Sequence, residues 1–95
     1  MIENQHIEWK RSWRDEFMKW ICAFANGKGG VLEIGRDNRG RIIGLPDVEQ
    51  LLEELPNKIR DLLGIIADVD LMEEKGKRYI RITIEPFPYP ISFRG

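Results

Sequence analysis

A stripe of large apolar residues, followed directly by glycines and an apolar strand, constrains the fold most. The stripe runs at helical spacings of three, four and seven through Trp13, Phe17, Trp20, Ile21 and Phe24. Such a pattern predicts an amphipathic helix that buries one face. Ser12, three residues before Asp15, predicts the start of this helix. Asn26-Gly27 predicts its end, because both residues tolerate the left-handed conformation that ends many helices.

The remaining apolar segments predict the strands of a small sheet. Alternating or mostly apolar residues predict strands within residues 5–10, 31–35, 67–71 and 80–84. Residues 37–40 have strong turn chemistry. The short segment 41–44 is then expected to return as a strand and form a hairpin.

A second helix is predicted between these strands. It is expected to begin at Asp47, to bury an apolar face between Val48 and Leu63, and to end at Gly64. Pro56 falls inside this run and is expected to kink the helix or split it in two. The predicted order is β-α-β-β-α-β-β. This order predicts an α/β (α+β) fold with two helices packed on a mixed, largely antiparallel sheet.

The length of 95 residues allows one domain with one core. We therefore expect a single domain over residues 1–95. Its last part, residues 86–95, is expected to be an extended tail, because the prolines there prevent a regular ladder. Cys22 is the single cysteine, and no apolar run approaches the roughly 20 residues that cross a bilayer. Both features favour a cytoplasmic protein.

Charge is sorted along the chain. Residues 10–41 hold eight basic and four acidic residues, whereas residues 42–76 hold three basic and nine acidic ones. The overall net charge of −1 differs from the strongly basic composition of a self-sufficient DNA-binding domain. The basic first half nevertheless predicts a surface that contacts phosphate. The alternative is that these charged residues only form solvent-exposed faces of the fold and bind nothing.

Several motifs together resemble the Schlafen-type, Alba-like domain. Residues 23–35 read Ala-Phe-Ala-Asn-Gly-Lys-Gly-Gly-Val-Leu-Glu-Ile-Gly, which is similar to the signature of that family. Glu8-Trp9-Lys10 resembles the Glu-Phe-Lys strand before the family's first helix. Asp37, followed by residues 42–44, resembles its acidic turn and return strand, and residues 90–95 resemble its Pro-x-x-x-Arg-Gly segment. The resemblance spans nearly the whole chain and implies the N-terminal module of a longer protein.

The resemblance implies a nucleic-acid-binding module of a prokaryotic transcriptional regulator. It favours DNA over RNA, a homodimer, a further C-terminal domain in the same chain, no catalysis and no cofactor. The basic residues expected to contact phosphates are Lys10, Arg11, Arg14, Lys28, Arg36, Arg39 and Arg41. Such contacts supply affinity but carry no sequence information.

The family is also described as ATP-binding. The glycines of residues 27–30 follow the predicted helix, and the C-terminal end of a helix repels phosphate. The sequence therefore predicts no phosphate cradle at these glycines.

Two other functions remain open. Some family members cleave RNA through two glutamates and an aspartate, and Glu3, Glu8 and Asp37 resemble those residues. Under this alternative the three carboxylates hold Mg²⁺ or Mn²⁺, which would supply a hydroxide nucleophile. The structural alternative makes Glu8 an ion-pair partner and Asp37 a turn residue. The third function is an oligomerisation or scaffold domain that positions a C-terminal effector.

Overall fold

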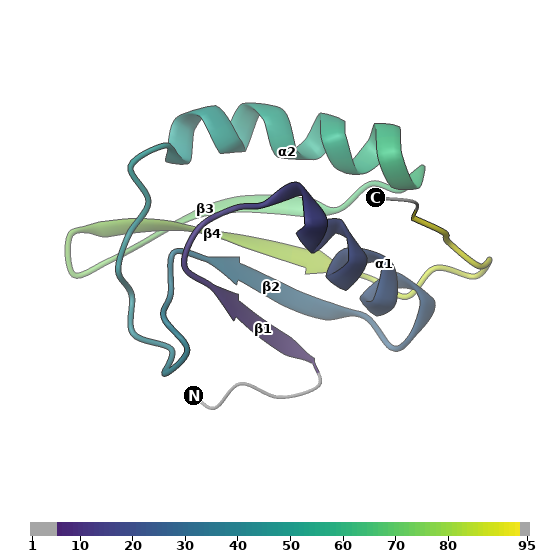
Figure 1. The fold of residues 1–95 in the computed structure, drawn as a ribbon, viewed down its shortest axis with the longest axis horizontal. Helices are drawn as coiled ribbons and strands as arrows, with labels where there is room; N and C mark the ends of the chain where they lie inside the picture. Colours follow the sequence, from purple (N-terminus) through teal and green to yellow (C-terminus); the bar gives the residue numbers. More distant parts are fainter. Residues whose placement is uncertain (1–5, 94–95) are drawn as a thin grey trace.

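The strands form one mixed sheet in the order β1-β2-β4-β3 (Figure 1). The structure, a computed structural model, describes residues 6–93. Its elements are β1 (Ile7–Lys10), the 3₁₀ turn η1 (Asp15–Phe17), α1 (Met18–Asn26), β2 (Gly30–Ile34), α2 (Val48–Leu63), β3 (Asp68–Glu74) and β4 (Lys77–Ile84). β1 runs parallel to β2, whereas β4 is antiparallel to both β2 and β3. The predicted fold class, two helices on a mixed sheet, is confirmed.

Both helices cover the same face of the sheet (Figure 1). Alternate residues of the central strands point toward them, so that Leu32 and Ile34 of β2 and Ile80 and Ile82 of β4 are buried. They join the apolar sides of both helices in one core cluster. Apolar residues recur every two positions in the strands and about every 3.6 positions in the helices. This periodicity determines which face of the sheet the helices cover. Within residues 6–93, no helix is both long and apolar enough to cross a membrane.

The first helix begins later than the sequence predicts. Ser12 was expected at its start, but α1 begins at Met18 after the 3₁₀ turn η1. Asp15 does not cap a helix here, because its Oδ1 accepts hydrogen bonds from Trp13 Nε1 at 2.7 Å and from Lys58 Nζ at 3.0 Å. These hydrogen bonds tie the segment before α1 to α2. The prediction that the helix starts at Ser12 is wrong.

The second helix is continuous. Asp47 occupies the N-cap position, although its side chain makes no capping hydrogen bond, and Gly64 ends the helix with a φ of 72°. Pro56 lies inside α2, so the prediction that it splits the helix is wrong, and the alternative of a kink stays a prediction. The proline is exposed, and water can hydrogen-bond the backbone carbonyl that a proline leaves without a donor.

The predicted return strand after β2 is reduced to a single bridge. Arg36 and Ile42 form an isolated antiparallel bridge, and no ladder is assigned to residues 41–44. Gly35, with a φ of 109°, turns the chain away from the sheet. Its carbonyl accepts the backbone N–H groups of Ile43 and Gly44, at 2.8 and 3.1 Å. Residues 35–45 therefore form a loop, which we call the β2–α2 loop.

The proline-rich tail docks on α1, where Asn26 and Cys22 both hydrogen-bond the backbone of Ile91. Asn26 Nδ2 donates to the carbonyl of Ile91 at 2.7 Å, and Ile91 N donates to Asn26 Oδ1 at 2.7 Å. The amide thus bonds both backbone groups of Ile91 as a neighbouring strand would. Ile91 and Phe93 also pack against the core cluster. Asn26 therefore anchors the tail as well as ending the helix.

Replacing Asn26 with alanine is expected to loosen the tail at Ile91. Both hydrogen bonds to Ile91 are lost, and each is worth about 1 kcal/mol. Hydrogen exchange should show the amide of Ile91 losing protection while the amides of β4 keep theirs. Asn57→Ala, which alters an exposed asparagine of α2, is the matched control. Unchanged protection at Ile91 would contradict the anchoring role of Asn26.

Candidate functional site

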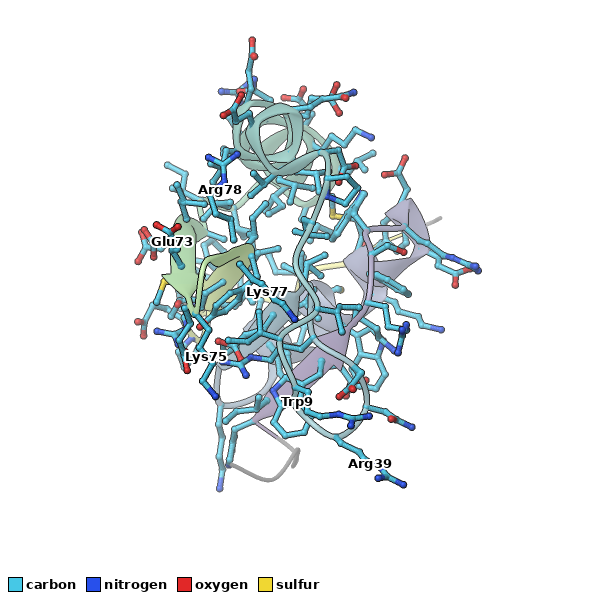
Figure 2. All side chains as sticks on the ribbon, turned by 90° about the vertical axis from the view of Figure 1, so that its left-hand side faces the viewer. Trp9, Arg39, Glu73, Lys75, Lys77 and Arg78 are labelled. Atoms are coloured by element: carbon cyan, nitrogen blue, oxygen red, sulfur yellow. The ribbon has the colours of Figure 1, made fainter. Side chains whose placement is uncertain are left out.

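Two basic loops meet at one end of the sheet. The β2–α2 loop and the tight turn between β3 and β4 line a pocket of about 410 Å³, which we call the basic pocket. Its lining residues are Arg36, Gly40, Arg41, Ile42, Glu74, Lys75 and Lys77. Figure 2 views the molecule from this end and shows Lys77 reaching toward the loop, while Arg39 extends into solvent. Lys77 Nζ lies 3.4 Å from the carbonyl oxygen of Ile42 and so links the two loops.

Asp37 organises the β2–α2 loop. Its Oδ1 accepts the backbone N–H groups of Arg39 and Arg41, each at 2.9 Å, and its Oδ2 accepts Arg41 Nε at 2.8 Å. Burial raises the pKa of the Asp37 carboxyl. The hydrogen bonds from the backbone and guanidinium of Arg41 and from the backbone N–H of Arg39 lower this pKa by more than burial raises it. The pKa of Asp37 therefore lies below its usual value of 3.8. The ionised carboxylate holds Arg39 and Arg41 at the rim of the pocket.

Asp37→Asn is expected to make the free energy of unfolding depend less on pH in the acid range. Because the folded-state pKa of Asp37 is lowered, its carboxylate stabilises the fold above about pH 3.8. This stability is lost as the pH falls through the folded-state pKa. Urea unfolding between about pH 2 and 6 should show a smaller acid loss in the variant than in the native chain. Some loss remains, because hydrogen bonds from Trp13 and Lys58 also lower the pKa of Asp15. Parallel profiles would contradict the role of Asp37.

Arg36 supports the loop from beneath. Its Nε lies 2.7 Å from Oε1 of the buried Glu33, and its other nitrogens donate to the Gly40 carbonyl and to the Tyr79 hydroxyl. Arg81 pairs with the second Glu33 oxygen at 2.8 Å, and this hydrogen bond raises the pKa of Arg81. The sequence predicts Arg36 as a phosphate contact. The structure gives its guanidinium several partners inside the protein.

A glycine and a tryptophan fix how closely this loop lies on the sheet. Gly40 has a φ of 81°, and a Cβ atom there would lie 2.7 Å from the Trp9 ring. Trp9 is buried in β1, and Figure 2 shows it below the basic pocket. Its position beneath the loop makes Trp9 a packing residue, so its ring is not free to stack on a base.

Lys75 and Lys77 are basic residues of this site that sequence reasoning missed. Lys75 is the one non-glycine residue with positive φ within the described range, at 54°, and Gly76 follows at 76°. Two successive positive φ values define the tight hairpin turn that usually takes asparagine or glycine first. A lysine in this conformation is unusual. The sequence signal for the turn is Gly76, which follows Lys75 between two segments of alternating polarity. The turn places Lys75 in the lining of the same pocket as Arg41.

The other predicted contacts divide between the two ends of the sheet. Lys10 and Arg11 lie at the end of β1, beside the start of the β2–α2 loop, because Gly35 N and Arg36 N both donate to the Lys10 carbonyl. The Lys10 ammonium is partly engaged by Glu8 Oε2 at 3.1 Å and by the rings of Phe17 and Trp20. Arg11 is exposed, as is Arg14, which lies 4.0 Å from Glu16. Lys28 is also exposed but precedes β2, at the far end of that strand.

The predicted metal-binding carboxylates are not assembled among the described residues. Glu8 pairs with Lys10, and both oxygens of Asp37 accept hydrogen bonds from the loop. Across residues 6–93, no group of three His, Cys, Asp or Glu side chains is placed to hold a metal ion. Glu3 lies outside this range, so the set of Glu3, Glu8 and Asp37 stays a prediction.

Comparison with known proteins identifies the family. The family model described as "Schlafen, AlbA_2" matches residues 3–93. The chain therefore belongs to the Schlafen AlbA_2 family, and the resemblance in its sequence motifs is confirmed to this extent. No curated protein matches the chain.

Two solved structures share the fold. The N-terminal domain of a RecG-related protein from Nitrosomonas europaea superposes with a TM-score of 0.83 at 25% identity, over 100% of this chain and 74% of that one. The DIP2311 protein from Corynebacterium diphtheriae superposes with a TM-score of 0.77 at 22% identity, over 94% of this chain. The present chain spans only 19% of the length of DIP2311.

Proposed function

We propose that this domain binds nucleic acid, with a preference for DNA, through phosphate contacts at the basic end of the sheet and without catalysis. The observation that carries the proposal is that Arg41, Lys75 and Lys77, from two loops distant in sequence, line one pocket, while Arg39 extends into solvent from the same loop as Arg41. Arg39 and Lys75 have no carboxylate partner among residues 6–93. Unpaired, exposed cations are the groups that displace counterions from a phosphate backbone.

The proposed contacts favour affinity over sequence readout. The cations lie on loops, and the core-facing sides of both helices are buried against the sheet. A recognition helix that inserts into the major groove needs an exposed face with side chains for base edges. The exposed side of α2 instead carries acids such as Glu49, Glu53 and Asp61, which DNA repels. We therefore expect binding to duplexes of different sequence with similar affinity.

The relatives support a nucleic-acid context. The protein from N. europaea is named as related to the ATP-dependent DNA helicase RecG, and the similar region is its N-terminal domain. By analogy, we propose that the present domain delivers a larger cytoplasmic protein, such as a transcriptional regulator, to nucleic acid. A homodimer would double the basic surface and would strengthen weak binding by one domain. The proposal requires no cofactor.

Salt-dependent binding tests the proposal. The affinities of the purified chain for labelled duplex DNA, single-stranded DNA and RNA are compared at about 20 and 200 mM salt. We expect binding that weakens steeply with salt and is strongest for duplex DNA. Parallel samples with Mn²⁺ are run on a denaturing gel and should remain intact.

The other outcomes select the other functions. Cleavage that requires Mn²⁺ and is lost in Glu8→Gln would replace this proposal with the metal-dependent nuclease. The absence of both binding and cleavage, together with a mass that rises with concentration, would replace it with the scaffold function.

A further inference from the structure

We infer that the basic pocket receives a phosphate monoester at the end of a nucleic-acid strand, rather than a phosphodiester within the strand. This inference rests on the proposed function and narrows its ligand class. Three observations carry it: the charges inside the pocket, its concave shape and the backbone conformation of Lys75.

The charges in the pocket leave two lysines to act on a ligand. The positive charge of Arg36 is matched by Glu33, and that of Arg41 by Asp37. In the described part of the chain, neither Lys75 nor Lys77 forms an ion pair, and Lys77 donates a hydrogen bond to the neutral carbonyl of Ile42. A phosphodiester carries one negative charge, whereas a terminal phosphate carries about two at neutral pH. The dianion therefore matches the two lysines better.

The shape of the site separates the two kinds of phosphate. The pocket has about 410 Å³, is open to solvent and is lined by residues of the β2–α2 loop and of the β3–β4 turn. A phosphate inside a strand has the chain continuing in both directions and is best contacted by a ridge. A terminal phosphate enters such a pocket end-on, so cations from both loops can bond its oxygens.

The turn holds Lys75 in a conformation that its residue type disfavours. A lysine at a φ of 54° is less stable there than asparagine or glycine would be. Such strained positions cluster where function requires a particular side chain. The ammonium group of Lys75 at the pocket wall gives this position a function that asparagine lacks.

Removing the negative charge of Glu74 should have the opposite effect on binding in this pocket to removing the positive charge of Lys75. Glu74 is the one carboxylate among the lining residues and forms no ion pair there with Lys75 or Lys77 within residues 6–93. Its negative charge should weaken the binding of a dianion. Glu74→Gln is therefore expected to strengthen the preference for a terminal phosphate.

The experiment compares oligonucleotides that differ only at their ends. One sequence, with an internal fluorophore, is prepared with a 5′-phosphate, with a 3′-phosphate and with hydroxyl groups at both ends. Affinities are measured by anisotropy for the native chain, for Lys75→Asn and for the matched control Lys19→Asn. Lys19 is an exposed lysine of α1 outside the pocket. Thermal unfolding of each variant is measured in parallel.

We expect one of the two terminal phosphates to raise the affinity of the native chain about fivefold. This is the effect of one additional charge about 4 Å from an ammonium group in water. The comparison of the 5′ and 3′ arms identifies which end enters the pocket. Lys75→Asn should abolish the increase while unfolding at the same or a higher temperature, and Lys19→Asn should preserve it.

Two outcomes overturn the inference without touching the proposed function. One is equal, salt-sensitive binding of all three oligonucleotides, and the other is an increase that persists in Lys75→Asn. If no oligonucleotide binds in a salt-sensitive way, the proposed function fails as well.

Discussion

Replacing Arg39, Lys75 and Lys77 together with alanine is expected to lower the affinity for duplex DNA about a hundredfold in 50 mM salt. Each cation contributes about 1 kcal/mol when it lies about 4 Å from a phosphate charge in water, and three such losses multiply. The slope of log affinity against log salt should also fall in magnitude by about 2.7, since each phosphate contact contributes about 0.9. Anisotropy titrations at several salt concentrations measure both quantities.

A second triple variant removes the same charge from another surface. Lys19, Lys58 and Arg60 lie on α1 and α2, away from the basic pocket, and are replaced with alanine as the control. If net charge alone attracts DNA, the two variants should lose affinity equally. If the basic pocket forms the interface, the control should keep nearly the full salt slope. Equal losses would therefore contradict the proposed location of the interface.

The sequence predicted the layers of the fold because periodicity records which face of an element is buried. The strand around Ile82 alternates, the strand around Leu32 is mostly apolar, and the apolar stripe of α2 recurs at helical spacing. These patterns follow from burial against a common core, so they are visible without a structure. The boundaries were less predictable. The start of α1 depends on Trp13 and Lys58, which bond Asp15, and one of these partners lies on another helix.

The β2–α2 loop shows a second limit of sequence patterns. The segment after the turn at Asp37 has the composition of a strand, yet it pairs with Arg36 only at Ile42. The conformation of Gly35 and the hydrogen bonds to its carbonyl decide this outcome. Local composition does not specify which residue of a glycine-containing segment takes the positive φ.

The candidate site was predicted in part. The basic residues of the β2–α2 loop stand out in the sequence because they flank a turn. Lys75 and Lys77 do not, because they follow two acids in a segment whose overall charge is negative. Their place beside Arg41 depends on β4 lying next to β2 in the sheet, with β3 at the edge. Strand order is a property of the whole fold, and no local pattern in the chain encodes it.

Glu33→Ala is expected to lower the free energy of unfolding by about 3 kcal/mol, the range found when one partner of a buried ion pair is removed. Only 2% of Glu33 is exposed, and its two oxygens pair with Arg36 at 2.7 Å and with Arg81 at 2.8 Å. The side chain of Arg36 is itself only 16% exposed, so its charge would remain largely buried without a partner. For a domain of this size the melting temperature should fall by roughly 15 °C. Thermal unfolding monitored by circular dichroism measures the change.

A double variant separates the charge of Glu33 from its packing. Glu33→Leu combined with Arg36→Met replaces the pair with apolar side chains of similar size. Such replacements of buried ion pairs are often neutral or stabilising. We therefore expect the double variant to unfold at a higher temperature than Glu33→Ala, because the largely buried charge of Arg36 is gone and the side chain of Arg81, which is 36% exposed, can be hydrated. It should still bind DNA less well, since Arg36 no longer holds the Gly40 carbonyl and the loop that carries Arg39 is less ordered. A double variant with native stability and native affinity would show that the ion pair neither stabilises the fold nor positions the loop.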